Sequence, residues 1–105
     1  MTEFRTMRRK RQELTETECT EILEKATSGV LSLLGDDGYP YGVPITPVLV
    51  GRKLYFHSAI KGHKVDAICN SDKASFTVID RNDVKPEEFT TYFRSVICFG
   101  KVRLI

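Results

Sequence analysis

The sequence predicts a mainly β protein, a β-barrel of antiparallel strands with short helices, and three observations support this prediction. Apolar residues gather in short runs separated by turn residues, as in small antiparallel barrels. Only two stretches have helical periodicity, which is too few for a doubly wound parallel sheet. The chain has 105 residues, of which 29% are charged, and this size and balance suit one globular domain.

Basic residues are concentrated at the N-terminus. Five of the 16 Lys and Arg residues lie in the first eleven positions, and the rest of the chain is close to neutral. Residues 1–13 are therefore predicted to be a basic arm, and residues 14–105 the domain. Such an arm could contact nucleic acid or an acidic partner, but a solvated tail is the commoner case, so nucleic acid is not an expected partner.

The sequence also indicates a cellular setting. No apolar run approaches the roughly 20 residues that span a bilayer, and no apolar stretch follows the N-terminal arginines. Cys19, Cys69 and Cys98 are far apart and form no C-x-x-C pair. We expect reduced, mostly buried thiols in a cytoplasmic protein, with neither a disulfide nor a zinc site.

The first third of the chain predicts a helix and then a strand. Thr15 and Glu18 form a T-x-x-E capping box, and apolar residues at helical spacing continue to about Ala26. Residues 29–34 form a short apolar run typical of a strand. Residues 35–38 are a strong turn signal.

Residues 39–50 resume strand character but contain three prolines, Pro40, Pro44 and Pro47. Proline cannot donate to a β-ladder, so this strand must lie at an edge, be bulged, or break near residues 44–47. A broken edge leaves backbone groups free for a ligand. A turn at residues 51–53 then predicts a hairpin with the strand at 54–57.

The second half predicts one more helix and two strands. Val65, Ile68 and Cys69 suit one face of a helix that ends near residue 70, and residues 74–79 form a strand. Residues 81–89 are polar and predict a surface loop. Residues 90–105 form the longest strand, with a bulge or close approach expected at Gly100.

Residues 54–64 carry the strongest functional signal. A strand leads into a loop and a helix start that together hold a hydroxyl, a glycine and positive charge at Ser58, Lys61, Gly62, His63 and Lys64. Free N–H groups and the positive end of a helix dipole would face the same point, which is how proteins hold a phosphate. An ordinary strand–helix connection with two solvated lysines explains the same pattern.

No other constellation indicates catalysis by the chain itself. Nothing orients Cys98 toward His57 or His63, a metal site lacks a third ligand, and no nucleotide-binding glycine motif occurs. A cofactor is therefore the expected source of any chemistry. Arg94 and Ser95 interrupt an apolar strand, where the guanidinium could face an anionic ligand, a subunit interface or solvent.

Five segments resemble, in order, one known family: M-R-R-K (residues 7–10), G-V-L-S-L (29–33), D-G-Y-P-Y-G-V-P-I (37–45), L-Y-F-H-S-A-I-K-G-H-K (54–64) and Y-F-R-S-V-I-C-F-G-K (92–101). The family is that of the pyridoxamine 5′-phosphate oxidase-like FMN-binding split-barrel proteins, and the chain is most similar to their nitroimidazole-resistance (Nim-type) branch.

This resemblance implies a homodimer with FMN at the interface. The isoalloxazine ring would lie against Val43, Pro44, Ile45 and Thr46, and His57 and Ser58 would line the ribityl and phosphate path. Lys64 would pair with the phosphate, and Lys61 and His63 are weaker candidates beside it. Arg94 and Ser95 would come from the same or the neighbouring subunit.

The resemblance also implies a function, an FMN-dependent oxidoreductase that passes electrons from NAD(P)H to a small substrate, with a nitro group as one acceptor. The alternative is a non-catalytic split-barrel module that binds flavin, haem or another anionic cofactor. Family members normally continue past the position of Ile105, so the barrel is expected to be incomplete at its C-terminal side.

Overall fold

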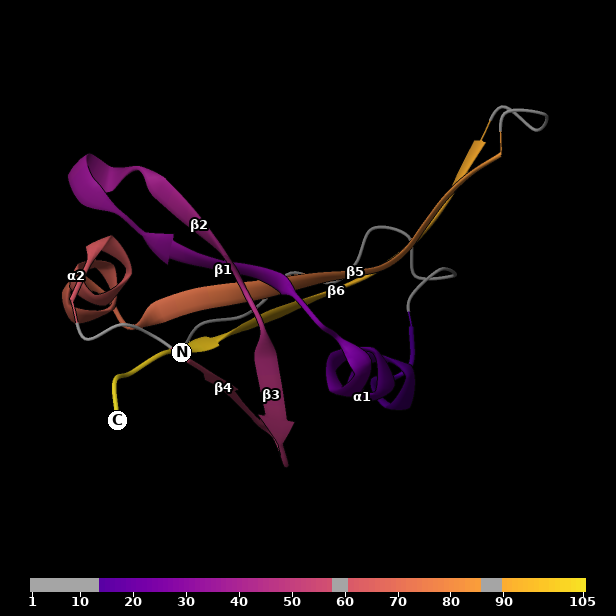
Figure 1. Cartoon of the computed structure of the whole chain (residues 1–105), viewed down its shortest axis with the longest axis horizontal. Helices are drawn as coiled ribbons and strands as arrows, with labels where there is room; N and C mark the ends of the chain where they lie inside the picture. The colour runs from indigo at the N-terminus through magenta and orange to yellow at the C-terminus, as the bar shows by residue number, and fades with distance from the viewer. Residues whose placement is uncertain (1–13, 58–60, 86–89) are drawn as a thin grey trace.

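The computed structural model describes residues 14–57, 61–85 and 90–105, and it is mainly antiparallel sheet with two short α-helices (Figure 1). This confirms the predicted fold class. The predicted basic arm, residues 1–13, lies outside the described residues. Within the described ranges, no helix is long and apolar enough to cross a membrane.

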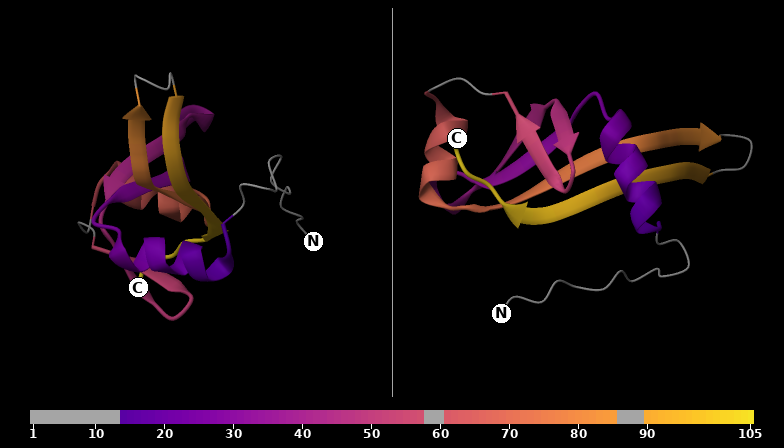
Figure 2. Two further views of the ribbon diagram at one scale, coloured as in Figure 1. Left: turned by 90° about the vertical axis from the view of Figure 1, so that its right-hand side faces the viewer. Right: turned by 90° about the horizontal axis from the view of Figure 1, so that it is seen from below.

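Helix α1 (Glu16–Lys25) begins at the predicted capping box. The Glu18 backbone N–H donates to Thr15 Oγ1 at 3.1 Å, and the Thr15 N–H donates to Glu18 Oε1 at 3.0 Å. These two bonds satisfy N–H groups that a helix start otherwise leaves free. The helix buries Ile22 and contacts strands from both sheets (Figure 2).

Within the described residues, six strands form two sheets. The larger has the order β2–β1–β5–β6 and consists of β1 (Gly29–Leu34), β2 (Pro40–Ile45), β5 (Lys73–Lys85) and β6 (Thr90–Lys101). The smaller is the predicted hairpin of β3 (Pro47–Val50) and β4 (Lys53–Phe56). The sheets do not close into a complete barrel.

The proline-rich stretch behaves as predicted. It is both an edge and a break, because β2 is an outer strand of the larger sheet and β3 belongs to the smaller one. Thr46 lies at the break, and its Oγ1 donates to the backbone oxygen of Thr27 at 2.8 Å. Pro40 and Pro44 therefore occupy an edge strand, where a missing donor costs least.

The hairpin of β5 and β6 corrects two predictions. Residues 81–85 continue β5 instead of forming a loop, because β6 offers them ladder partners as far as Lys85. The irregularity lies at Asp80, where the register passes from Ile79–Ser95 to Arg81–Arg94, whereas Gly100 pairs regularly with Ala74. Residues 86–89 lie outside the described residues, and β6 ends at Lys101.

Helix α2 (His63–Asn70) follows β4 and packs against β1, as the sequence predicts. Its buried residue is Ala67, and Cys69 is exposed. The prediction of mostly buried thiols is therefore wrong for Cys69, because it falls on the solvent side of the helix. Cys19 and Cys98 are half-buried, and all three cysteines are free of disulfides.

The core lies on one face of the larger sheet, under α1, α2 and the hairpin. Its buried members are Ile22, Leu31, Leu33, Ala67, Phe76, Val78 and Val96. The Phe56 and Phe76 rings, tilted by 56° with centroids 5.0 Å apart, join the hairpin to the sheet. Strand alternation sends Val30, Ile97 and Phe99 to the opposite face, where they stay exposed.

Candidate functional site

A groove of about 1420 Å³ runs between the hairpin, helix α2 and the end of β6. Its apolar wall includes the core residues Leu31 and Phe76 together with Phe56. The groove is larger than the roughly 300–1,000 Å³ of most small-molecule sites.

The groove has an excess of positive charge. Five Lys and Arg residues line it against two acids, Glu16 and Asp72. Glu16 Oε1 lies 3.4 Å from an Arg52 nitrogen, so that pair is neutralised. The other four cations make no ion pair within the described part of the chain, and they are Lys53, Lys64, Lys101 and Arg103.

Lys64 has the best placement for an anion. It is half-buried, it lies in the first turn of α2, and it lines the groove together with His57. Gly62 precedes the helix with φ 139°, a conformation that side chains rarely adopt, and no side chain caps the helix start. Among the described residues, no side chain therefore occupies the first N–H groups of α2. Ser58, the predicted hydroxyl, lies outside the described residues.

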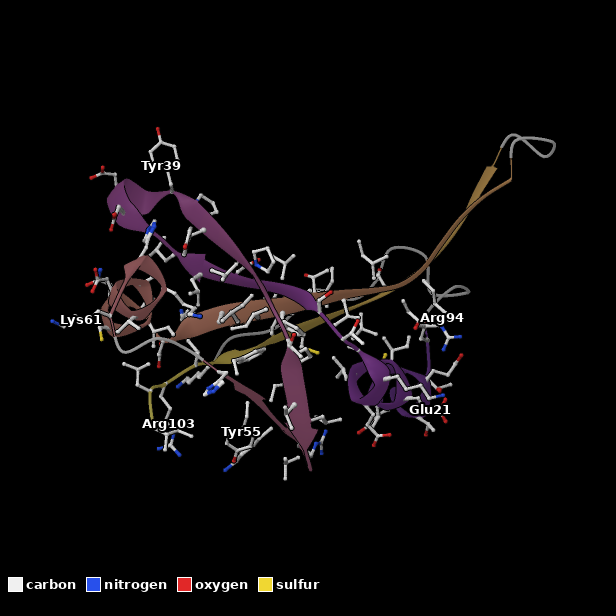
Figure 3. All side chains as sticks on the ribbon, viewed as in Figure 1. Glu21, Tyr39, Tyr55, Lys61, Arg94 and Arg103 are labelled. Carbon is white, nitrogen blue, oxygen red and sulfur yellow. The ribbon has the colours of Figure 1, made fainter. Side chains whose placement is uncertain are left out.

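The other two predicted phosphate residues face elsewhere. The His63 ring stacks on Tyr41 with centroids 3.8 Å apart and an interplanar angle of 18°. His63 Nε2 lies 3.7 Å from Asp36 Oδ2 in the turn between β1 and β2. Lys61 is exposed and projects away from the body of the molecule (Figure 3).

The predicted ring-binding segment divides between two sides. Val43 and Ile45 point toward the core, and Ile45 also lines the groove. Pro44 lies on the other side of the edge strand and is exposed, as is Thr46 at the break. A flat ligand on the groove side can therefore contact the side chains of Val43 and Ile45, but only the backbone of Pro44 and Thr46.

Arg94 lies at the opposite end of the molecule from Lys61 and α2, beside helix α1 (Figure 3). Its Nε is buried, has no hydrogen-bond partner, and lies 3.7 Å from Asp80 Oδ2. Ser95 is half-buried and pairs with Ile79 in the sheet. One chain therefore does not bring Arg94 to the same point as Lys64.

Two ionisable groups near α1 have shifted pKa values. The hydrogen bond from the Thr15 backbone, then that with its hydroxyl, lowers the pKa of Glu18, and the charge of Arg94 adds a smaller effect. Burial raises the pKa of the Cys98 thiol, and Cys19 raises it further. These shifts stabilise the neutral thiol and the ionised carboxylate.

Sequence reasoning missed the cations at the end of β6. Lys101 and Arg103 flank Val102, which packs against the core, and both line the groove. The alternating K-V-R pattern would have placed the two charges on one side of the strand. Lys53, at the start of β4, was missed because the groove is formed by segments that are far apart in the sequence.

An open antiparallel barrel with a cationic groove at a strand–helix corner defines the class of fold and site. The sequence model for pyridoxamine 5′-phosphate oxidase matches residues 15–105, and the chain belongs to this family. The family is in general one of flavin-binding proteins. No curated protein matches the chain.

Solved structures confirm the split-barrel fold. A protein from Bacteroides thetaiotaomicron, described as a candidate 5-nitroimidazole antibiotic resistance protein, aligns with a TM-score of 0.75 at 22% identity, over 87% of this chain and 56% of its own. The conserved hypothetical protein Rv2991 from Mycobacterium tuberculosis aligns with a TM-score of 0.72 at 19% identity, over 85% of this chain and 52% of its own. The chain thus spans little more than half the length of each.

Proposed function

We propose that the protein binds FMN and uses it to pass electrons from NAD(P)H to a small substrate. The observation that carries this proposal is Lys64, a half-buried cation at the first turn of α2 that has no ion pair among the described residues, in a member of a flavin-binding family. A phosphate held there receives a charge-assisted bond from the ammonium group and dipole stabilisation from the helix.

The residues at this corner fit a flavin phosphate. The helix start carries no side-chain cap that would compete for its N–H groups, and Gly62 leaves its approach open, with nothing near the position of an added Cβ. His57 lines the same groove and offers a further donor on the path from the phosphate. Lys61 and His63 have no part in the proposed contact.

A second copy of the chain is the proposed partner. The face of the larger sheet away from the core exposes Val30, Ile79, Ile97 and Phe99, with 57% of Ile97 and 61% of Phe99 accessible. Apolar residues gathered on one face favour burial in an interface. Arg94, whose buried Nε has no hydrogen bond among the described residues and lies 3.7 Å from Asp80 Oδ2, is on the α1 side of the sheet instead, and we propose that it contacts the ligand bound by the second copy.

Each group then has a defined task. Bound FMN would supply the redox chemistry by accepting and releasing a hydride. Lys64 and the helix start hold the phosphate, Ile45 of the edge strand supports the ring, and the apolar groove wall excludes water. Nitro compounds are candidate acceptors, because the Bacteroides neighbour is described in terms of 5-nitroimidazole resistance.

Flavin titration and reduction test the proposal. Purified protein should quench FMN fluorescence, its flavin absorbance should bleach anaerobically with NADH or NADPH, and a nitroaromatic should restore it. A protein that binds FMN but is not reduced would be a binding module instead of an oxidoreductase. A protein that does not bind FMN at all would contradict the proposal.

A further inference from the structure

The side chain of His63 attaches the start of helix α2 to the β1–β2 hairpin. His63 is the first residue of the helix, and its ring stacks on that of Tyr41 in β2, with centroids 3.8 Å apart and an interplanar angle of 18°. Its Nε2 also lies 3.7 Å from Asp36 Oδ2, in the turn between β1 and β2. Figure 1 shows α2 beside this turn. We call His63, Tyr41 and Asp36 the clasp.

The first turn of α2 needs a tertiary contact of this kind. The helix has only eight residues, and helices shorter than about 12–15 residues are marginal in water on their own. Its buried residue, Ala67, lies beyond the first turn, and no side chain caps the start. The stack on Tyr41 therefore supports the turn that has neither a cap nor a buried side chain.

The turn between β1 and β2 approaches the stack closely. A Cβ added to Gly35 would lie 2.9 Å from Tyr41 Cβ and 3.4 Å from His63 Nε2. The Gly35 N–H donates to the Tyr39 backbone oxygen at 2.8 Å, which fixes the turn in this place. Glycine permits such an approach because it has no side chain. The hairpin and the helix start are therefore packed directly against each other.

The clasp joins the two parts of the groove that the proposed function assigns to the flavin. Tyr41 lies on the core side of β2 together with Val43 and Ile45, and Ile45 lines the groove. His63 directly precedes Lys64, which lines the groove at the helix start. None of the clasp residues is among the described residues that line the groove. Any effect of the clasp on a bound ligand would therefore act through the helix start.

We propose that His63 is a positioning residue, which holds the start of α2 against β2 and so sets the position of Lys64 relative to Ile45. In the proposed function, on which the consequence rests, this spacing lets one FMN molecule place its phosphate and its ring at the same time. The His63 ring acts through its stack on Tyr41 and does not itself contact the phosphate.

Amide hydrogen exchange in the flavin-free protein, followed by NMR, tests the positioning. The Asp66 N–H donates to the Gly62 oxygen in the first turn, and the Ser71 N–H donates to the Ala67 oxygen at the other end of the helix. Tyr41→Leu removes the ring but keeps apolar bulk. It should speed exchange at Asp66 by roughly two- to tenfold relative to Ser71, as expected for loss of one aromatic contact.

Two further variants separate the stack from other effects on the hairpin. Tyr41→Phe keeps the ring and should restore the wild-type exchange rate at Asp66. Tyr39→Ala, a change at a residue that is 74% exposed beside the same turn, is the matched control and should leave the rate unchanged. Equal acceleration at both ends of the helix in Tyr41→Leu, or no acceleration at either, would overturn the proposal.

Flavin titration tests the consequence for the ligand. Tyr41→Leu should weaken FMN binding by roughly two- to tenfold and leave riboflavin, which lacks the phosphate, within about twofold of the wild type. His63→Phe keeps a ring that can stack on Tyr41 but has no nitrogen donor, so its FMN affinity should also stay within about twofold. A larger loss that affects FMN alone would overturn the proposal, because His63 would then contact the phosphate directly.

The two experiments distinguish this inference from the proposed function. If the wild type does not bind FMN but exchange at Asp66 depends on the Tyr41 ring, the flavin proposal fails and the positioning of α2 stands. If FMN binds with an affinity that does not depend on the Tyr41 ring, the flavin proposal stands and the positioning role is rejected.

Discussion

The α2 side and the α1 side of the molecule hold two basic residues in contrasting states. Lys64, on the α2 side, lines an open groove and has no ion pair among the described residues. Arg94, on the α1 side, has a buried Nε without a hydrogen bond and lies 3.7 Å from Asp80. The α2 side presents a positive charge that a ligand bound to the same chain can contact. The α1 side holds a donor that has an ion-pair partner but no hydrogen bond among the described residues.

Lys64 and Arg94 both lie in segments that resemble the family, but one folded chain does not bring them together. The resemblance implied that Lys64 and Arg94 contact one ligand, yet Arg94 lies beside α1, far from α2 (Figure 3). The two groups can serve one ligand only if a second copy brings its Arg94 to the first copy's α2.

The largest effect is expected from the core that both sides share. Phe76→Ala should lower the free energy of unfolding by about 3–5 kcal/mol, because Phe76 is 3% exposed and packs against Phe56. Chemical denaturation measures the loss, with Val48→Ala as an exposed control expected to cost less than about 1 kcal/mol. Separate unfolding transitions for the two sides of the wild-type protein would contradict a shared core.

Mixed dimers test whether Arg94 acts across an interface. Lys64→Ala and Arg94→Met should each weaken FMN binding in homodimers, by about 1.5–3 kcal/mol for loss of a charge-assisted contact. A heterodimer of the two variants should regain one site of wild-type affinity, because one of its two sites then combines both native residues. Isothermal titration of purified heterodimers measures the number of tight sites. Two weakened sites would mean that both residues act in the same chain.

The capping box should stabilise the α1 side without affecting the flavin corner. Thr15→Ala should lower the free energy of unfolding by about 0.5–2 kcal/mol and leave FMN affinity unchanged. The pKa of Glu18 is lowered in the folded chain, so its contribution is present above the ordinary value of 4.5 and is lost as the pH falls through the lowered value. Thermal denaturation at several pH values measures both effects. The exposed neighbour Thr17, replaced by Ala, is the matched control.

The smallest expected effect concerns Cys98. Because burial raises its pKa, the folded chain holds the thiol proton more tightly than the unfolded chain does, so stability should fall as the pH rises above the ordinary value of 9.0. For a half-buried group the loss should stay below about 1 kcal/mol. Denaturation across this pH range should show it in the wild type and in Cys69→Ala, but not in Cys98→Ala. A loss that persists in Cys98→Ala would assign it to another group.

Local signals predicted the local structure well. The capping box at Thr15, the break at Thr46 and the helix that begins after Gly62 each depend on residues within a few positions of one another. Such features follow from backbone geometry, from proline's missing donor and from the conformational freedom of glycine. The same local signals also predict that Lys64 lies in the first turn of a helix.

The missed features depend on pairing between distant segments. Residues 81–85 have a polar composition typical of a loop, yet β6 gives them a ladder partner, and the bulge falls at Asp80 instead of Gly100. His63 stays a weaker phosphate candidate, and the stacking of its ring on Tyr41 joins two elements that no local pattern in the sequence connects. Lys101 and Arg103 line the same groove as the hairpin, which no local pattern in the sequence predicts.

The most direct test of the central claim is the affinity of the Lys64→Ala protein for two flavins. FMN binding should weaken by about 1.5–3 kcal/mol, whereas riboflavin, which lacks the phosphate, should bind as it does to the wild type. Lys61→Ala should leave both affinities unchanged, because Lys61 is exposed and projects away from the groove. Fluorescence titration that finds FMN affinity unchanged in Lys64→Ala, or reduced equally for both flavins, would contradict a phosphate seat at the start of α2.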